Sequence, residues 1–268
     1  MSELGELWRA REVVYNLARR DLKVRYKNSV LGFFWSFLNP VLQIMVFWFL
    51  INYGLNVDTE NYRVQLFACF IPWMFFSQSL QDGSQAVIKN LSLVKKVYFH
   101  RQALPLSSLA SNFVHFVLAL LVLGAVYIYL AIRVHMGLTW AHVPVAALGL
   151  IVQIIFCYGL MLITCSLSVF YEDILFLLAA VLNLWFFLSP VLYPVAMVSQ
   201  RLRGVLADVY MLNPMVAPLI AYRSIIPPNP LMEGFWAYFA FAAGVAVATL
   251  LVGQWVFRRF EWLFPERA

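Results

Sequence analysis

The chain has 268 residues, of which 63% are hydrophobic and only 12% are charged, and its mean hydropathy is +0.79. A soluble domain has roughly 45–50% apolar and about 25% charged residues, and one water-soluble core cannot bury this much apolar surface. The composition therefore excludes an ordinary soluble protein. In a membrane protein the net charge of +6 reports topology rather than a nucleic-acid partner.

The first predicted element is a basic amphipathic helix that precedes the apolar runs. Apolar residues recur at three- and four-residue steps between Leu4 and Leu22, and basic residues fill other positions. Such a helix is suited to the headgroup plane of a bilayer. We expect residues 1–29 to form this cytoplasmic interface helix. The candidate functional residues of this interface helix are Arg19, Arg20, Asp21 and Arg25.

Six apolar runs follow, and each is predicted to be a transmembrane helix. A spanning helix needs roughly 20 mostly apolar residues, and these runs are continuous rather than alternating in polarity, as barrel strands would be. The fold class is therefore an all-α integral membrane protein, with residues 30–258 as the six-span domain and 259–268 as a cytoplasmic tail. The predicted spans are Leu31–Tyr53, Val64–Gln81, Leu104–Ile132, Val143–Tyr171, Ile174–Tyr193 and Phe235–Phe257, with the second continuing past Asp82.

Basic residues predict the orientation of these spans. If the N-terminus is inside, 14 of the 19 lysines and arginines lie in the inner segments, as the positive-inside rule requires. An even number of spans then places both termini in the cytoplasm, with the protein in the cytoplasmic (inner) membrane.

A seventh apolar run, Val209–Tyr222, lies between spans 5 and 6 but is too short to cross a bilayer. It contains Pro214 and Pro218, and we expect Val195–Ile226 to form one or two short helices that re-enter the outer face. An ordinary extracellular loop is the alternative. Just before it, Pro190 and Pro194 are predicted to break the outer end of span 5, as in the broken helices of transporters.

Two inner segments have the character of protein contacts. The loop Lys89–Leu106 mixes basic and apolar residues and predicts a short helix that docks into a groove on another protein, or else an interfacial helix on lipid. The turn between spans 4 and 5 carries Glu172 and Asp173, which are acidic on a side that is otherwise basic.

Several kinds of chemistry have no motif in this sequence. There is no G-x-x-x-x-G-K-[ST] phosphate loop, no H-E-x-x-H and no G-x-S-x-G. The spans lack carboxylates apart from Asp82 near an inner end, which disfavours an ion-coupled carrier. His115 within span 3 is either a packed neutral histidine or a proton-handling residue. No catalytic or metal-binding residue is assigned, and energy for transport must come from elsewhere.

The order of these features resembles one family. Tyr26–Pro40 (YKNSVLGFFWSFLNP), Leu93–Pro105 (LVKKVYFHRQALP) and Leu212–Met215 (LNPM) are similar to segments of type-2 ABC exporter permeases, in the branch that exports O-antigen, capsule or teichoic acid. Phe170–Ile174 matches a family position that often has a basic-Asp pair, although Glu172 replaces the basic residue here.

The resemblance implies a transport subunit, not an enzyme, that exports a lipid-linked polysaccharide. Two permease copies would form a homodimeric conduit, and two separate ATPase subunits would bind ATP and Mg²⁺, so that this chain itself holds no cofactor. The ATPase-coupling residues that it implies are Lys95, Lys96, Val97, Tyr98, Phe99, Glu172 and Asp173.

Aromatic side chains are candidates for the substrate pathway, because sugar rings stack on them. Aromatic residues make up 17% of the chain, and the alternative explanation for this high content is interfacial anchoring and lipid-facing packing. The pathway candidates are Trp48, Phe49, Tyr53, Trp73, Phe76, Trp185, Phe186 and Tyr193.

Two other functions stay open at this level. An exporter of drugs or smaller lipids would share the fold but have a narrower, less aromatic pathway. An integral membrane lipid-linked glycosyltransferase would need carboxylates or a metal site at the membrane edge, and Glu172–Asp173 is the only adjacent acidic pair.

Overall fold

The structure is a computed structural model that describes residues 11–25, 62–96, 99–134, 137–195, 197–198, 205–227 and 230–267, with eight further positions between 34 and 49. Within these residues all regular structure is helical, which agrees with the predicted all-α class. The predicted span 1, Leu31–Tyr53, lies largely outside the described residues, so its helix stays a prediction.

Five helices occupy the sequence positions of the other predicted spans. They are α4 (Tyr62–Ser84), α7 (Ala103–Val134), α8 (Val143–Ser168, preceded by the short η3, Trp140–His142), α9 (Asp173–Phe187) and α13 (Phe235–Phe260). Among the described helices, three are long and apolar enough to cross a membrane, in the segments Ala103–Arg133, Trp140–Ser168 and Phe235–Leu263. As predicted, α4 continues past Asp82.

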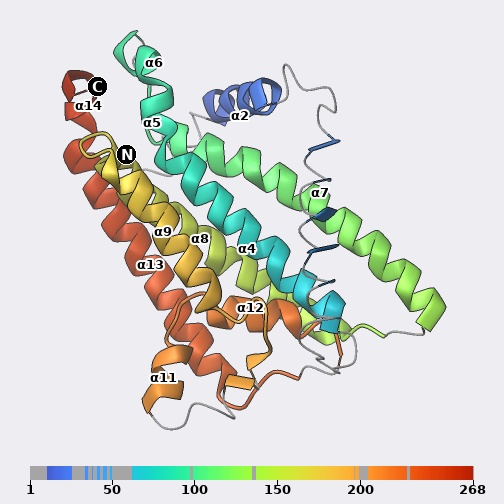
Figure 1. The fold of residues 1–268 in the computed structure, drawn as a ribbon. Coiled ribbons are helices and arrows are strands. Elements are labelled where there is room, and N and C mark those ends of the chain that lie inside the picture. The colour runs from blue at the N-terminus through green and yellow to red at the C-terminus, as the bar shows by residue number, and fades with distance from the viewer. Residues whose placement is uncertain are drawn as a thin grey trace.

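The long helices form an antiparallel bundle with two distinct ends (Figure 1). One end carries α5 (Ala86–Lys89), α6 (Leu91–Lys96), the α8–α9 turn and α14 (Phe264–Arg267). We call it the basic end, because Lys89, Lys95, Lys96 and Arg101 lie there. The far end carries η3, α11 (Val205–Met211) and α12 (Val216–Arg223), where Thr139 donates its backbone N–H to the carbonyl of Ile225 at 2.9 Å.

Helix α8 lies at the centre of the bundle and contacts α4, α7, α9, α12 and α13. Its closest approach is to α13. A β-carbon built on Gly159 would lie 2.6 Å from the backbone nitrogen of Leu250, and one on Gly253 would lie 2.4 Å from the carbonyl oxygen of Gly159. The two backbones therefore touch where only glycine fits, which is how membrane helices gain packing without a hydrophobic driving force.

Helix α2 (Arg11–Arg25) lies across α7 at the basic end (Figure 1). The side chain of Leu17, a residue of α2, is buried. An apolar cavity of about 490 Å³ beside the crossing is lined by residues that include Val14, Ala18 and Leu22 of α2 and Ala110 of α7. The apolar positions Val14, Leu17, Ala18 and Leu22 of α2 thus lie on the side that faces α7.

Helix α9 is shorter than the predicted span 5. It ends at Phe187, so its 15 residues extend about 22 Å at 1.5 Å per residue, less than the roughly 30 Å hydrocarbon core. The cause is Pro190, because a proline excludes its preceding residue from the helical region and cannot itself donate a helical hydrogen bond. Beyond it, α11 and α12 form two short helices bent by 78°, as the sequence predicted for this region.

Candidate functional site

The predicted docking loop is helical in two short pieces, α5 and α6. Asn90 joins them: its side-chain amide donates to the carbonyl of Ala86 at 2.8 Å, and its own carbonyl accepts the N–H groups of Leu93 and Val94 at 3.0 Å each. Val94 is buried and anchors α6 to the core. This anchoring leaves the side chains of Lys95 and Lys96 exposed at the end of α6.

The other coupling candidates lie at the same end of the bundle or outside the described residues. Glu172 and Asp173 are exposed at the α8–α9 turn, where Asp173 opens α9 and suits the positive end of the helix dipole. Ser168 fastens this turn to α4, because its hydroxyl donates to the carbonyl of Ser84 at 2.7 Å. Phe99 is half-buried against the core. Val97 and Tyr98 lie outside the described residues.

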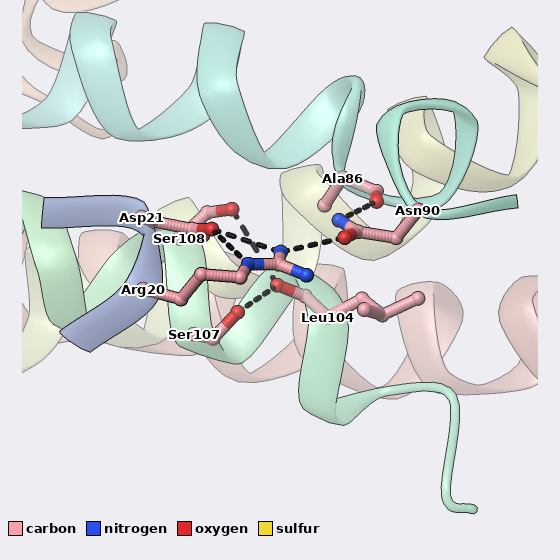
Figure 2. A network of polar contacts seen from close by, with 7 residues as sticks. All are labelled: Arg20, Asp21, Ala86, Asn90, Leu104, Ser107 and Ser108. Carbon is pink, nitrogen blue, oxygen red and sulfur yellow. Dashed lines mark hydrogen bonds and ion pairs between the residues drawn. The ribbon is translucent and has the colours of Figure 1, made fainter. Parts of the chain in front are cut away.

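A polar network connects α2 to the α5–α6 junction (Figure 2). The Arg20 guanidinium donates to the side-chain oxygen of Asn90 at 2.6 Å and pairs with Asp21 at 2.9 Å. A cavity of about 630 Å³ opens beside this network, lined by residues that include Lys89 of α5, Asp82 of α4 and Asn112 of α7. The network attaches α2 to the α5–α6 junction.

The two other interface-helix candidates are Arg19 and Arg25. Arg19 is exposed and lines the apolar cavity on the other side of α2. The side chain of Arg25 lies outside the described residues.

Four pathway candidates meet in one aromatic cluster between α4, α8 and α9, which we define as Trp73, Phe76, Phe156, Trp185 and Phe186. Trp185 is edge-on to Phe76 at 5.6 Å and to Phe156 at 5.8 Å, and Phe186 lies 5.8 Å from Trp73. Trp73 is 3% exposed and Phe76 is fully buried, so other side chains of this chain cover both rings. Trp185 and Phe186 are half-buried at the cluster edge.

The other pathway candidates are Trp48, Phe49, Tyr53 and Tyr193. Phe49 is exposed, whereas Trp48 and Tyr53 lie outside the described residues. Tyr193 follows the break in span 5, and its hydroxyl donates to the carbonyl of Phe187 at 2.8 Å.

Residues 188–193 form the broken end of span 5. Side chains from α4, from α12 and from the turn between α11 and α12 hold this segment by hydrogen bonds. Asn213 donates to the carbonyl of Leu188 at 3.3 Å and to the hydroxyl of Ser189 at 3.2 Å. Tyr62 of α4 donates its hydroxyl to the carbonyl of Leu192. These bonds satisfy backbone groups that the break removes from the helix, as irregular backbone at membrane depth requires.

Arg223 makes the largest contribution to this arrangement. The residue is 5% exposed, and its guanidinium donates to the carbonyls of Tyr193 at 2.6 Å, Pro190 at 3.0 Å and Val191 at 3.1 Å. In the described part of the chain, no acidic side chain forms an ion pair with it. The carbonyl dipoles therefore solvate a buried positive charge, and the charge in turn fixes the shape of the break.

Sequence reasoning did not assign these roles to Arg223, Asn213 or Tyr62. A signal for Arg223 exists, because it is a charged residue directly after the short apolar run Val209–Tyr222. A cation in such a place needs partners, although the sequence does not identify backbone carbonyls 30 residues away as those partners.

Comparison with known proteins adds an independent finding. Residues 12–226 match the model of the ABC-2 type transporter family. The chain is 34% identical over 223 residues to the O-antigen export system permease protein RfbA of Myxococcus xanthus, with 82% of each chain covered. It is 27% identical over 263 residues to the permease of the same name in Klebsiella pneumoniae, covering 98% of this chain and 96% of that one. The chain therefore belongs to the ABC-2 type transporter family, as a membrane transport subunit whose ATPase is a separate subunit.

Proposed function

We propose that this chain is the permease of an ATP-driven exporter that moves a lipid-linked polysaccharide, such as an O-antigen, across the cytoplasmic membrane. The observation that carries the proposal is the similarity to permeases named for O-antigen export, which extends over 98% of this chain in one case. Two copies would form the conduit, and two ATPase subunits would bind ATP and Mg²⁺.

The proposed membrane arrangement has six spans, with both termini and α2 on the cytoplasmic side. Residues 1–29 would form the interface region, 30–258 the membrane domain, and 259–268 the C-terminal segment. Support comes from the lysines and arginines of α5 and α6 at the basic end, and from those of α2, which packs against α7. Lysine and arginine favour the cytoplasmic side of a membrane protein.

The proposed ATPase contact is the exposed surface of the basic end. Lys95 and Lys96 at the end of α6 and Glu172 and Asp173 at the α8–α9 turn supply charges of both signs, which favours one docking orientation over others. Val97, Tyr98 and Phe99 continue the same segment and complete the proposed contact.

The proposed polysaccharide pathway has two kinds of aromatic side chain. Phe49, Trp185, Phe186 and Tyr193 have exposed or half-buried rings, which supports a direct contact with sugar. Trp73 and Phe76 are covered in this conformation, so their proposed role is to support Trp185 from behind. Trp48 and Tyr53 complete the proposed set.

Charge reversal tests the proposed coupling surface. We expect the double variant Lys95→Glu/Lys96→Glu to insert normally but to lose co-purification with its ATPase or stimulation of ATP hydrolysis, together with export. Export is measured as surface polysaccharide in a strain that lacks its own permease and carries the cognate ATPase.

A matched control is Arg133→Glu, which reverses an exposed cation at the far end of α7. It should leave ATPase binding unchanged. If the Lys95/Lys96 variant exports and stimulates hydrolysis like the parent, the coupling assignment is wrong. If the unsubstituted permease, expressed together with its ATPase, exports no lipid-linked polysaccharide, the substrate assignment is wrong.

A further inference from the structure

The C-terminal segment folds back onto the bundle after α13. It consists of η4 (Glu261–Leu263) and α14. Phe264, four residues from the end of the chain, is fully buried. Its ring lies 5.4 Å from that of Phe257 in an edge-on arrangement and 6.5 Å from that of Phe170. The buried ring of Phe264 belongs to the hydrophobic core of the bundle, so its packing holds this segment in a defined position.

This segment contacts both elements of the proposed ATPase surface. On one side α14 packs against α6, whose buried residue is Val94. Arg101, which follows α6, donates to the backbone carbonyl of Glu261. On the other side Phe170, at the α8–α9 turn, lies 5.4 Å from Phe260 and also faces Phe264. The C-terminal segment thus joins two elements that are about 75 residues apart in sequence.

The mechanical argument follows from the length of α6. A six-residue helix is not stable in isolation, so its position depends on what it packs against. When a partner protein displaces a short helix, the displacement reaches the membrane spans only if the helix is packed firmly against them. The buried anchor Val94, the Arg101 bond and Phe264 supply that support, and none of them lies at the exposed end of α6.

We propose that residues 261–267 form a C-terminal clasp that positions α6 and the α8–α9 turn relative to each other, so that both respond together to the ATPase. Phe264 and Arg101 are positioning residues that act through α6 and the turn. This proposal rests on the proposed function, because it concerns the same coupling surface, but its geometric part is testable in the permease alone.

The geometric test uses a pair of spin labels at Lys95→Cys and Tyr171→Cys, both exposed positions on the two elements that the clasp joins. The three native cysteines are buried, so labelling is selective, and dilution with unlabelled protein removes distances between copies. We expect Phe264→Ala to broaden the distance distribution. The control Trp262→Ala, at an exposed position two residues away, should leave the distribution unchanged.

The functional test measures export per ATP hydrolysed in the assembled transporter. We expect Phe264→Ala to keep the ATPase bound but to lower this ratio about tenfold, within the usual range of coupling between two sites. Phe264→Leu, which restores apolar bulk, should recover most of the ratio, whereas a merely structural loss would lower the yield of assembled transporter instead.

The second variant, Arg101→Gln, weakens the clasp without opening the core, and serves if Phe264→Ala does not fold. An unchanged label distribution in both variants overturns the clasp. A broadened distribution with an unchanged export ratio overturns its role in coupling. If the labels respond but the Lys95→Glu/Lys96→Glu variant still couples normally, the clasp geometry stands and the proposed docking surface fails.

Discussion

Trp185 in α9 donates its indole N–H to the side-chain oxygen of Asn213 at 2.9 Å, across 28 residues of sequence. The same oxygen accepts the backbone N–H of Met215 at 3.1 Å, and the amide group of Asn213 donates to Leu188 and Ser189. One asparagine therefore connects the aromatic cluster, the broken end of span 5 and the start of α12. At the far end of the bundle, hydrogen bonds rather than a continuous helix fix the chain after α9.

Two substitutions separate the parts of this connection. Trp185→Phe keeps an aromatic ring in the cluster but removes the N–H, so we expect a loss of about 1 kcal/mol in stability. Asn213→Ala removes the hydrogen-bond partner of the Trp185 indole, the Ser189 hydroxyl and the Met215 N–H, all in part-buried bonds, and should cost about 1–3 kcal/mol. Thermal unfolding of the purified protein in detergent measures both. The control is Asn183→Ala, at an exposed position of α9, the helix that carries Trp185. This variant should have the stability of the parent. Equal stabilities of all three variants would contradict this account of Asn213.

Arg223 is expected to tolerate neither loss nor replacement of its guanidinium. Arg223→Met leaves three buried carbonyls without a donor, which should cost about 1–3 kcal/mol. Arg223→Lys keeps the charge but lacks the planar fork that reaches several acceptors at once, so an intermediate loss is expected. Thermal unfolding and export are the measurements.

The control for Arg223 is Arg133→Lys, at an exposed cation near the same end of the bundle, which should behave like the parent. An Arg223→Met variant with the parent's stability and export would show that the guanidinium does not hold the broken segment.

The contact between α8 and α13 depends on glycine. Gly253→Ala adds a β-carbon 2.4 Å from the carbonyl oxygen of Gly159, which forces the two helices apart, and Gly253→Val should be worse. We expect reduced membrane yield and a lower unfolding temperature. Gly244→Ala on the same helix meets nothing within 4 Å and should be neutral or slightly stabilising, because alanine favours helix by about 1 kcal/mol. A Gly253→Ala variant as stable as Gly244→Ala would refute the close contact.

The positions of the helices could be predicted from sequence because the bilayer imposes a minimum apolar length. The α4 helix continues past Asp82 as predicted, and Pro190 breaks span 5 as predicted. The early end of α9 at Phe187 was not predicted, because apolar residues continue up to the proline and carry no sign of where helical hydrogen bonding stops. The side chains that stabilise the break, Arg223 and Asn213, come from later in the chain.

Which helix faces are buried could not be predicted, and the reason is physical. In lipid, an exposed leucine and a buried leucine face similar surroundings, so apolar periodicity does not mark the core. Trp73 and Phe76 were chosen as pathway candidates on residue type alone, and the convergence of α4, α8 and α9 covers both. Glycines are equally ambiguous, because Gly253 is at a close contact while Gly244 is open.

The orientation of the bundle leads to a labelling prediction. The charge asymmetry predicts that the basic end faces the cytoplasm, so a cysteine at Lys95 should react with a membrane-impermeant maleimide only after the cells are permeabilised. A cysteine at Trp140, exposed at the far end in η3, should react in intact cells. The unsubstituted chain is the control, because its three cysteines are buried and should not react in either condition.

The permease is expressed without the ATPase, so that no bound ATPase can cover a cysteine at position 95. If this cysteine does not react in intact cells, the reason is then that it faces the cytoplasm. Lys95 belongs to α6, and Trp140 directly precedes the start of α8. Because α6 and the start of α8 lie at opposite ends of the bundle (Figure 1), the two variants must give opposite results if the bundle spans the membrane in a single orientation. Labelling of Lys95→Cys in intact cells, with Trp140→Cys protected, would invert the topology and place the proposed ATPase surface outside the cell. That result would overturn the coupling proposal together with the orientation, since ATP is hydrolysed in the cytoplasm.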